Sequence, residues 1–171
     1  MTLPVEVRRA APDEVEAARE LTNRSWLGVY PALIGHDVTE EIIRTRHASD
    51  LFAQQQAENP EGFLVALSEG VIVGHCHHFP TDSGIYVDRL HVEPSLKRGG
   101  VGREMMEFVF AHETDAERIW LTVLQGNDGA LAFYQRIGMT IVGEKASNTG
   151  LAGIPAIELE WRNDGGKHIA E

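Results

Sequence analysis

The segment at positions 92–103 contains the residues whose types and spacing best suit binding chemistry. It reads Val-Glu-Pro-Ser-Leu-Lys-Arg-Gly-Gly-Val-Gly-Arg and joins a strand-like apolar stretch directly to a helical one. Backbone N–H groups that converge in such a loop bind phosphate oxygens, because glycines remove obstructing Cβ atoms and the positive end of the helix dipole adds to the attraction. Lys97, Arg98 and Arg103 add basic charge. The segment therefore predicts a local anion site.

Two common nucleotide-binding motifs do not fit this loop. A P-loop requires Gly-x-x-x-x-Gly-Lys-Ser/Thr, and neither Gly99 nor Gly100 is followed by that arrangement. A dinucleotide fingerprint requires Gly-x-Gly-x-x-Gly, but the third position after Gly100 and Gly102 is Met105. On these residues alone a second interpretation stays open, in which the glycines only form a tight turn between a strand and a helix.

Two separate motifs resemble those of the GNAT superfamily of acyl-CoA-dependent N-acyltransferases. The first is Arg/Gln-x-x-Gly-x-Gly/Ala after a strand of the form Leu-x-Val-x-Pro. It is matched by Leu90, Val92, Pro94, Lys97, Gly100 and Gly102, with Lys97 in place of Arg or Gln. The second is Asn-x-x-Ala-x-x-Phe-Tyr-x-x-x-Gly-Phe, matched by Asn127, Ala130, Phe133, Tyr134 and Gly138, with Met139 at the final aromatic position. The two motifs occur in the expected order.

The resemblance implies acetyl-CoA as a co-substrate and no metal. The loop would hold the pyrophosphate of coenzyme A, with cofactor contacts at Leu90, His91, Val92, Lys97, Arg98, Gly99, Gly100, Val101, Gly102 and Arg103. The second motif would add Asn127, Ala130, Phe133 and Tyr134. In the family, the position of Asn127 binds the pantetheine region and the position of Tyr134 lies beside the thioester sulfur.

The implied reaction is acetyl transfer to the primary amine of a small molecule or peptide, by direct attack in a ternary complex. It needs a neutral amine, a stabilised oxyanion and a proton for the leaving thiolate. By resemblance the oxyanion donor is the backbone N–H of Val92 and the proton donor is Tyr134. Asp88 could accept the amine proton directly or through water. Packing of Tyr134 against the sheet, and pairing of Asp88 with Arg89 or another cation, stay open as alternatives.

For recognition of the acceptor, the resemblance points to Trp26 and Tyr30 in an irregular segment. The polar residues of the run 75–78, His77 among them, are expected to line a substrate cleft or to be solvated. Ordinary core packing is an equally good interpretation of the two aromatic residues. The run His75-Cys76-His77-His78 suggests a metal site or a nucleophile, but alternate residues of a strand point to opposite faces. No three of these side chains converge, so we predict neither.

The elements that must position these residues follow from hydrophobic periodicity. Strands are expected at 5–8, 63–67, 71–74, 85–92, 119–124, 139–144 and 156–161, and helices at 12–25, 39–56, 101–112 and 127–138. A Glu-Gly pair at 69–70 predicts a hairpin turn. The order β-α-α-β-β-β-α-β-α-β-β predicts an α/β (α+β) domain with a mixed central sheet of about seven strands flanked by about four helices.

Composition is consistent with this domain. The 171 residues, 43% of them hydrophobic, suit a single globular domain, expected at 1–162, with a flexible tail at 163–171. The net charge of −11 disfavours nucleic acids and anionic membranes as partners, and a single cysteine forms no internal disulfide. With no basic patch before an apolar run and no apolar stretch near ~20 residues, the chain is expected to be cytoplasmic.

Two other functional classes remain as alternatives to the enzyme. One is a regulatory module that binds acyl-CoA without turnover, and the other is a structural domain whose glycine loop binds nothing. The family resemblance alone also suggests a homodimer.

Overall fold

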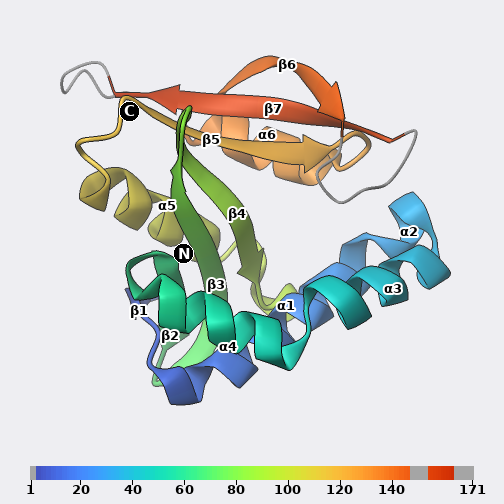
Figure 1. Cartoon of the computed structure of the whole chain (residues 1–171), viewed down its shortest axis with the longest axis vertical. Coiled ribbons are helices and arrows are strands. Elements are labelled where there is room, and N and C mark those ends of the chain that lie inside the picture. The colour runs from blue at the N-terminus through green and yellow to red at the C-terminus, as the bar shows by residue number, and fades with distance from the viewer. Residues whose placement is uncertain (1–2, 147–153, 164–171) are drawn as a thin grey trace. The chain divides into compact units, whose positions relative to one another are not determined.

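The computed structural model describes residues 3–146 and 154–163 (Figure 1). In chain order its elements are β1 (Glu6–Arg9), α1 (Val15–Val29), α2 (Pro31–Ile34), α3 (His36–Arg46), α4 (Ser49–Glu58), β2 (Phe63–Ser68), β3 (Val71–Thr81), β4 (Gly84–Val92), α5 (Val101–His112), β5 (Arg118–Leu124), α6 (Asp128–Arg136), β6 (Thr140–Ala146) and β7 (Pro155–Arg162). The strands form a seven-stranded sheet in the order β1-β2-β3-β4-β5-β7-β6. Because β4 and β5 are parallel while β5, β7 and β6 pair antiparallel, the predicted mixed sheet and α/β class are confirmed.

The helical region before β2 differs from the predicted one. A single helix was expected at 39–56, but α3 ends at Arg46 and α4 begins at Ser49. Ala48 between them has extended backbone angles (φ −66°, ψ 145°), which end the first helix. Ser49 and Asp50 then stand in the first turn of α4, where such residues favour a new helix start. The short helix α2, in the segment expected to be irregular, was not predicted either.

The chain divides into two compact units whose boundaries fall within β3, β4 and α5. The first contains Met1–Phe79 and Asp88–Val109, and the second contains Pro80–Val87 and Phe110–Glu171. The glycine loop therefore belongs to the first unit, and the Asn127 motif belongs to the second.

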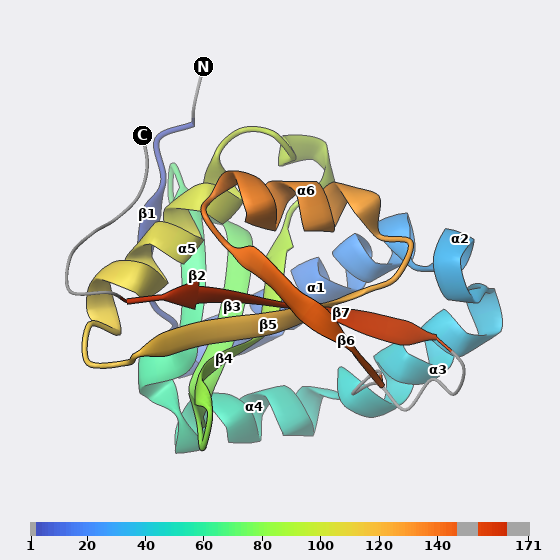
Figure 2. The same cartoon turned by 90° about the horizontal axis from the view of Figure 1, so that it is seen from above.

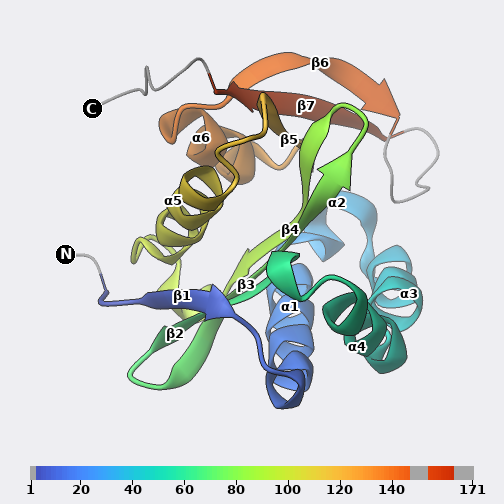
Figure 3. The same ribbon diagram turned by 60° about the vertical axis from the view of Figure 1, so that its left-hand side comes forward.

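In the first unit, α1 and α4 cover one face of the sheet formed by β1, β2 and β3 (Figure 3). The register of β2 and β3 pairs Phe63 with His77 and Val65 with His75, so these four side chains share that face. The buried core between sheet and helices contains Ala10, Val15, Ala18, Phe52, Phe63, Val65 and Leu67. Two histidines thus lie next to an apolar core.

Helix α5 lies against the other face of the same strands. A Cβ atom at Gly74 would come within 2.7 Å of Met105 Cε and 3.0 Å of Val101 Cγ1. Since Val101 is the first residue of α5, glycine in β3 lets the start of this helix approach the sheet closely. This packing fixes where the glycine loop enters the helix.

In the second unit, β5, β7 and β6 lie side by side (Figure 2). Ile119 pairs with Trp161 and Leu121 with Leu159, and all four side chains are buried on one face. Phe110 stacks on Trp161 with ring centroids 4.7 Å apart. Helix α6 packs next to β6, which follows it in the chain.

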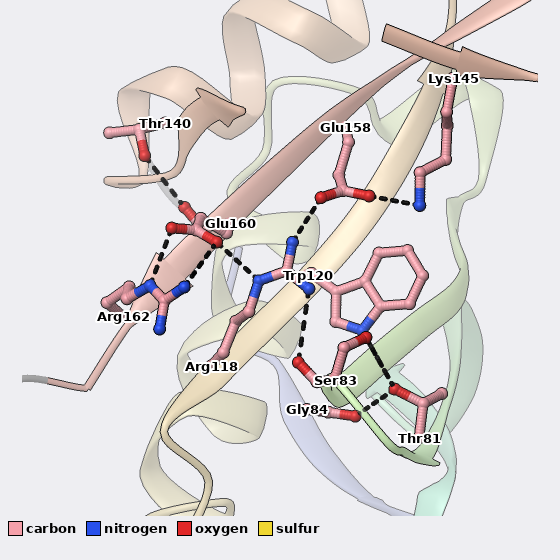
Figure 4. Close-up of polar contacts among 10 residues, drawn as sticks. All are labelled: Thr81, Ser83, Gly84, Arg118, Trp120, Thr140, Lys145, Glu158, Glu160 and Arg162. Atoms are coloured by element: carbon pink, nitrogen blue, oxygen red, sulfur yellow. Dashed lines mark hydrogen bonds and ion pairs between the residues drawn. The ribbon is translucent and has the colours of Figure 1, made fainter. Parts of the chain in front are cut away.

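The opposite face of β5 and β7 carries an ionic network (Figure 4). Arg118 donates to Glu160 over 2.6 Å and also pairs with Glu158. Lys145 pairs with Glu158, and Arg162 donates to Glu160 over 2.9 Å. Each carboxylate therefore accepts from two cations, and these contacts connect β5, β6 and β7.

The end of β7 is held to the rest of its unit. The backbone N–H of Asn163 donates to the carbonyl of Glu117, and its side-chain amide donates to the carbonyl of Thr114. Of the expected tail at 163–171, residues 164–171 lie outside the described residues. No helix among 3–146 and 154–163 combines the length and the apolar character needed to cross a bilayer.

Candidate active site

The glycine loop is a compact series of turns after β4. The N–H of Glu93 donates to the carbonyl of Val73 in β3, which fixes the end of β4. The N–H of Leu96 then bonds to the carbonyl of Glu93 over 2.8 Å, and that of Gly99 bonds to the carbonyl of Leu96 over 3.1 Å. These bonds turn the chain back toward the start of α5.

The backbone conformation of the loop explains the glycine at position 100. Arg98 and Gly100 both have positive φ angles, 72° and 87°. Glycine adopts this region without the steric cost that a Cβ atom brings. The first intrahelical bond runs from the N–H of Glu104 to the carbonyl of Gly100. Gly100 therefore stands at the N-terminal boundary of α5.

The start of α5 leaves four backbone donors available. A helix cannot satisfy its first four N–H groups internally, and here these belong to Gly100, Val101, Gly102 and Arg103. Within residues 3–146 and 154–163, none of the four donates to a protein acceptor. The loop thus makes the turn and also presents the donors that a phosphate group requires.

Basic side chains stand around these donors. Lys97, Arg98 and Arg103 are all exposed. Arg103 pairs with Glu107 on the same helix over 2.9 Å. In the described part of the chain, Lys97 and Arg98 form no ion pair. A diphosphate at the helix start would therefore meet two uncommitted cations.

The three remaining β4 positions with predicted cofactor contacts lead into this loop. Leu90, His91 and Val92 are half-buried, and Nδ1 of His91 lies 3.0 Å from Oγ of Ser25 in α1. Burial, followed by the neighbouring charges, lowers the pKa of His91 to about 3, so the ring is neutral. The contact to Ser25 joins the end of β4 to α1.

Asp88 lies in a network with His77 and Arg89. Nδ1 of His77 lies 3.1 Å from Oδ2 of Asp88, and Nη1 of Arg89 lies 3.4 Å from the same oxygen. Burial raises the pKa of the Asp88 carboxyl, but the His77 hydrogen bond and the charge of Arg89 outweigh it, so the pKa is lowered. Asp88 is therefore an ionised acceptor, and Nδ1 of His77 carries the proton that it donates. Of the alternatives left open by the sequence, the pairing of Asp88 with Arg89 is present.

Arg89 is a buried cation fixed on every side. Nη2 donates to Oε1 of Gln55 over 2.7 Å and Nε donates to Nε2 of His75 over 3.3 Å. The guanidinium carbon lies 4.0 Å from the centroid of the Phe52 ring. Burial lowers the pKa of Arg89 to about 10, which leaves it charged at neutral pH. Gln55 and Phe52 were not singled out from the sequence as parts of this site, and His75 was named only within the run 75–78.

The histidine-rich run of β3 is buried rather than solvated. Burial raises the pKa of the Cys76 thiol to about 12, which suppresses the nucleophilic thiolate. His75 donates from Nδ1 to the carbonyl of Leu64 over 2.9 Å, so both its ring nitrogens are occupied. In the residues that the structure describes, no group of three His, Cys, Asp or Glu residues could hold a metal ion.

Trp26 and Tyr30 stack at the end of α1. Their ring centroids are 3.8 Å apart, and the edge of the Trp26 ring meets His47 at 5.2 Å. Trp26 is only 7% exposed, so it packs in the core as well as standing at a predicted acceptor position. Its Nε1–H is buried and has no hydrogen-bond partner among residues 3–146 and 154–163. A buried indole donor of this kind is suited to bind an oxygen that the chain itself does not supply.

In the second unit, the Asn127 motif forms the start of α6. Oδ1 of Asn127 accepts the N–H of Ala130 over 3.4 Å, which is the expected N-cap arrangement. Phe133 and Tyr134 meet edge to face at 5.0 Å, and Tyr134 is 8% exposed. The motif therefore has a structural role in shaping this helix, alongside the binding roles that the resemblance gives it.

Fold and loop together define the type of domain. A mixed seven-stranded sheet in which a glycine loop joins β4 to α5 is the arrangement expected from the resemblance to the GNAT superfamily. Residues 16–139 match the model of the acetyltransferase (GNAT) family. The chain belongs to this family.

Known relatives agree with this assignment. The 5-NmdU N-acetyltransferase of Pseudomonas phage PaMx11 is 32% identical over 106 residues, which cover 60% of this chain and 74% of the phage protein. The paiA N-acetyltransferase from Thermoplasma acidophilum, solved in complex with coenzyme A, has a TM-score of 0.83 at 16% identity over 94% of this chain and 99% of its own. Naa20 of Chaetomium thermophilum, solved with a bisubstrate analogue, has a TM-score of 0.68 at 20% identity over 97% of this chain and 92% of its own. At these identities the two structures establish the shared fold.

Proposed function

We propose that the protein transfers the acetyl group of acetyl-CoA to the primary amine of a small molecule or peptide, by direct attack in a ternary complex. The observation that carries this proposal is the row of four available N–H donors at the start of α5, at the end of the strand-loop motif of the family. The coenzyme A complex of the Thermoplasma acidophilum relative supports the choice of ligand.

The loop would bind the diphosphate of acetyl-CoA. The N–H groups of Gly100 to Arg103 would donate to its oxygens, and the helix dipole of α5 would favour the negative charge. The exposed side chains of Lys97 and Arg98 would form ion pairs with the diphosphate from the solvent side. Gly100 keeps the backbone free of side-chain atoms where the phosphates approach, whereas a Cβ added at Gly99 would meet Leu3 Cδ1 at 3.0 Å and the carbonyl oxygen of Leu96 at 3.1 Å.

The backbone N–H of Val92 is proposed to stabilise the oxyanion of the thioester carbonyl. The N–H of Glu93 points to β3, where it donates to Val73. Consecutive N–H groups of a strand point to opposite sides, so the N–H of Val92 points away from β3. A backbone donor held in this way needs no reorganisation when charge develops on the carbonyl oxygen.

Proton transfers complete the proposed reaction. The amine nitrogen forms a bond to the thioester carbon, the C–S bond breaks, and the thiolate takes a proton from the Tyr134 hydroxyl. Asp88 accepts the proton that the nitrogen loses, directly or through water. The acidity of the nitrogen rises sharply once it has attacked the carbonyl, so an ionised carboxylate with a lowered pKa is a sufficient acceptor. Trp26 and Tyr30 are proposed to contact the amine substrate.

A glycine substitution tests the proposed binding site. Gly100→Val places a β-branched side chain at a φ of 87°, beside the donors of α5, and is expected to abolish binding of coenzyme A in titration calorimetry. Gly70→Val is the matched control, because Gly70 has a φ of 78° in the β2–β3 turn and a Cβ added there would meet no atom within 4 Å. It should cause similar backbone strain and leave coenzyme A affinity unchanged.

Turnover distinguishes an enzyme from a binding module. Release of free thiol from acetyl-CoA in the presence of a panel of primary amines is expected for the wild-type chain. Binding of acetyl-CoA without thiol release across the panel would favour the non-catalytic module. Equal coenzyme A affinity in the wild type and Gly100→Val would contradict the proposed site itself.

A further inference from the structure

Asp88 has one occupied and one available carboxylate oxygen. The contacts of His77 and Arg89 both end on Oδ2, at 3.1 and 3.4 Å. Among residues 3–146 and 154–163, no donor lies on Oδ1. Because the carboxylate is held from one side only, Oδ1 is left to accept a proton from elsewhere.

The two side chains of the pair differ in access to solvent. The side chain of Asp88 is 28% exposed, whereas that of His77 is 5% exposed. His77 lies between Phe63 and Phe79, with ring centroids 5.8 and 5.3 Å away. Asp88 can therefore meet a substrate, and His77 supports it from the buried side.

Arg89 is not able to take over this support. Its Nε and Nη2 are committed to His75 and Gln55, and Phe52 stacks on its guanidinium. Its contact to Asp88 is the longest of the set at 3.4 Å and comes from the neighbouring residue of the same strand. The hydrogen bond from His77 is thus the shorter of the two contacts that orient the carboxylate.

We propose that His77 is a positioning residue for Asp88, whose Nδ1–H holds Oδ2 and leaves Oδ1 facing the amine that is acetylated. The proposal rests on the acetyl transfer proposed above. It gives His77 a role through Asp88 rather than by direct contact with the substrate. In the reaction, the proton moves from the amine nitrogen to Oδ1, and His77 keeps its own Nδ1 proton throughout.

Electrostatics around the pair agree with this division of roles. Burial lowers the pKa of His77 and outweighs the hydrogen bond to Asp88, so the ring stays neutral. The charged and titratable groups that interact with the pair are Arg89, His75, His91, His47 and Cys76. Loss of the Nδ1–H donor should raise the pKa of Asp88, because burial would then be opposed mainly by Arg89.

Three substitutions at His77 separate positioning from proton transfer by His77 itself. The amide nitrogen of asparagine occupies the place of Nδ1, that of glutamine occupies the place of Nε2, and phenylalanine keeps only the ring volume. We expect His77→Phe and His77→Gln to lower kcat about 10- to 100-fold, the range that a hydrogen bond to a charged group supplies. His77→Asn should recover most of this loss, with the KM for acetyl-CoA unchanged in all three.

The pH dependence gives a second readout. The acidic limb of the kcat profile should move to higher pH in His77→Phe and His77→Gln, and stay near its wild-type position in His77→Asn. Equal loss in all three variants would show that a donor at the position of Nδ1 does not restore the function of His77, and would overturn the proposal. His77→Gln keeps a polar side chain, so it provides the test if His77→Phe does not fold. Full activity in His77→Gln would overturn the proposal as well.

A measurement without turnover keeps this inference separate from the proposed function. The carboxyl ¹³C resonance of Asp88, followed by NMR against pH in the full chain, reports its pKa directly. An upward shift in His77→Gln but not in His77→Asn supports the positioning role, even if no amine is ever acetylated. An unchanged Asp88 titration in both variants overturns the role, even if acetyl transfer is demonstrated.

Discussion

Nε of Arg89 donates to Nε2 of His75 over 3.3 Å, and this contact fixes the state of the histidine. A nitrogen that accepts from a guanidinium carries no proton, so the proton of His75 lies on Nδ1, from which it is donated to the carbonyl of Leu64. His75 must therefore be neutral in the folded protein. Burial is the largest cause that holds its pKa well below 6.5, and the charge of Arg89 adds to it.

Buried neutral histidines predict a loss of stability in mild acid. Burial lowers the pKa of His47 to about 4 and that of His91 to about 3. The unfolded chain binds these protons near pH 6.5 and the folded chain does not, so the stabilisation is complete above pH 6.5 and is lost as pH falls toward the folded pKa values. Each such group contributes a slope of about 1.4 kcal/mol per pH unit. Urea denaturation between pH 7.5 and 4 measures the effect.

A single substitution isolates one contribution. His91→Asn removes the titrating ring but keeps a donor near Oγ of Ser25, so its free energy of unfolding should fall less steeply with acid than that of the wild type. His36→Asn, at an exposed position, is the control for removing a histidine from the surface. Parallel curves for His91→Asn and the wild type would contradict the assignment of His91 as neutral in the folded protein.

Tyr134→Phe tests the proposed proton donor. Only the hydroxyl is removed, and the ring that packs beside Phe133 is kept. If Tyr134 protonates the thiolate, kcat should fall about 10²-fold or more, the low end of what general acids contribute, while the Kd for acetyl-CoA changes little. Single-turnover thiol release together with calorimetry checks both values. A variant with wild-type kcat would assign Tyr134 to packing alone, the alternative left open by the sequence.

Features set by local interactions were predictable from the sequence. The hairpin at Glu69 and Gly70, the N-cap at Asn127 and the strand-loop-helix at 92–103 each depend on residues within a few positions of one another. Turn and cap chemistry acts over the same short range, so the sequence carries it directly. The position of His75 and His77 on the same face of β3 also followed from strand periodicity.

Contacts made between distant segments were not predictable. Arg89 meets Gln55 from α4, 34 positions away, and nothing in the pattern of either segment specifies that pairing. The break between α3 and α4 at Ala48 was missed although Ser49 and Asp50 favour a helix start there, because hydrophobic periodicity alone does not mark the break. The support of Asp88 therefore became visible only in three dimensions.

The ionic network on β5 and β7 predicts unequal effects of two arginines. Arg118 is 12% exposed and pairs with both Glu158 and Glu160, whereas Arg162 is 61% exposed and pairs with Glu160 alone. Arg118→Met should lower the free energy of unfolding by about 2–3 kcal/mol, because two largely covered carboxylates lose a partner. Arg162→Met makes the same substitution at the more exposed position and should lower the free energy of unfolding by about 1 kcal/mol or less.

The ionisation of the two glutamates gives a further check on this network. Burial raises the pKa of Glu158 and Glu160, but their cationic partners outweigh it and lower both values. Their contribution is present above the unfolded pKa and is lost as pH falls through the folded one, so Arg118→Met and the wild type should approach each other in strong acid. Equal destabilisation by the two substitutions at pH 7, measured by urea denaturation, would contradict the difference in burial.

The unpartnered Nε1–H of Trp26 predicts an effect on substrate binding that exceeds its effect on stability. A buried donor without a partner costs about 1–3 kcal/mol, so Trp26→Phe removes this penalty while it also loses packing against Tyr30. The two changes oppose each other, and the free energy of unfolding should change by about 1 kcal/mol or less. Trp120→Phe is the matched control. The indole N–H of Trp120 donates to Oγ1 of Thr81 over 3.2 Å, so this substitution leaves the Thr81 hydroxyl without that donor.

If Trp26 donates to an oxygen of the amine substrate, Trp26→Phe should raise the KM for the amine about 10-fold, the value of one hydrogen bond, and leave the KM for acetyl-CoA unchanged. A large loss of stability with an unchanged KM for the amine would place Trp26 in the core alone.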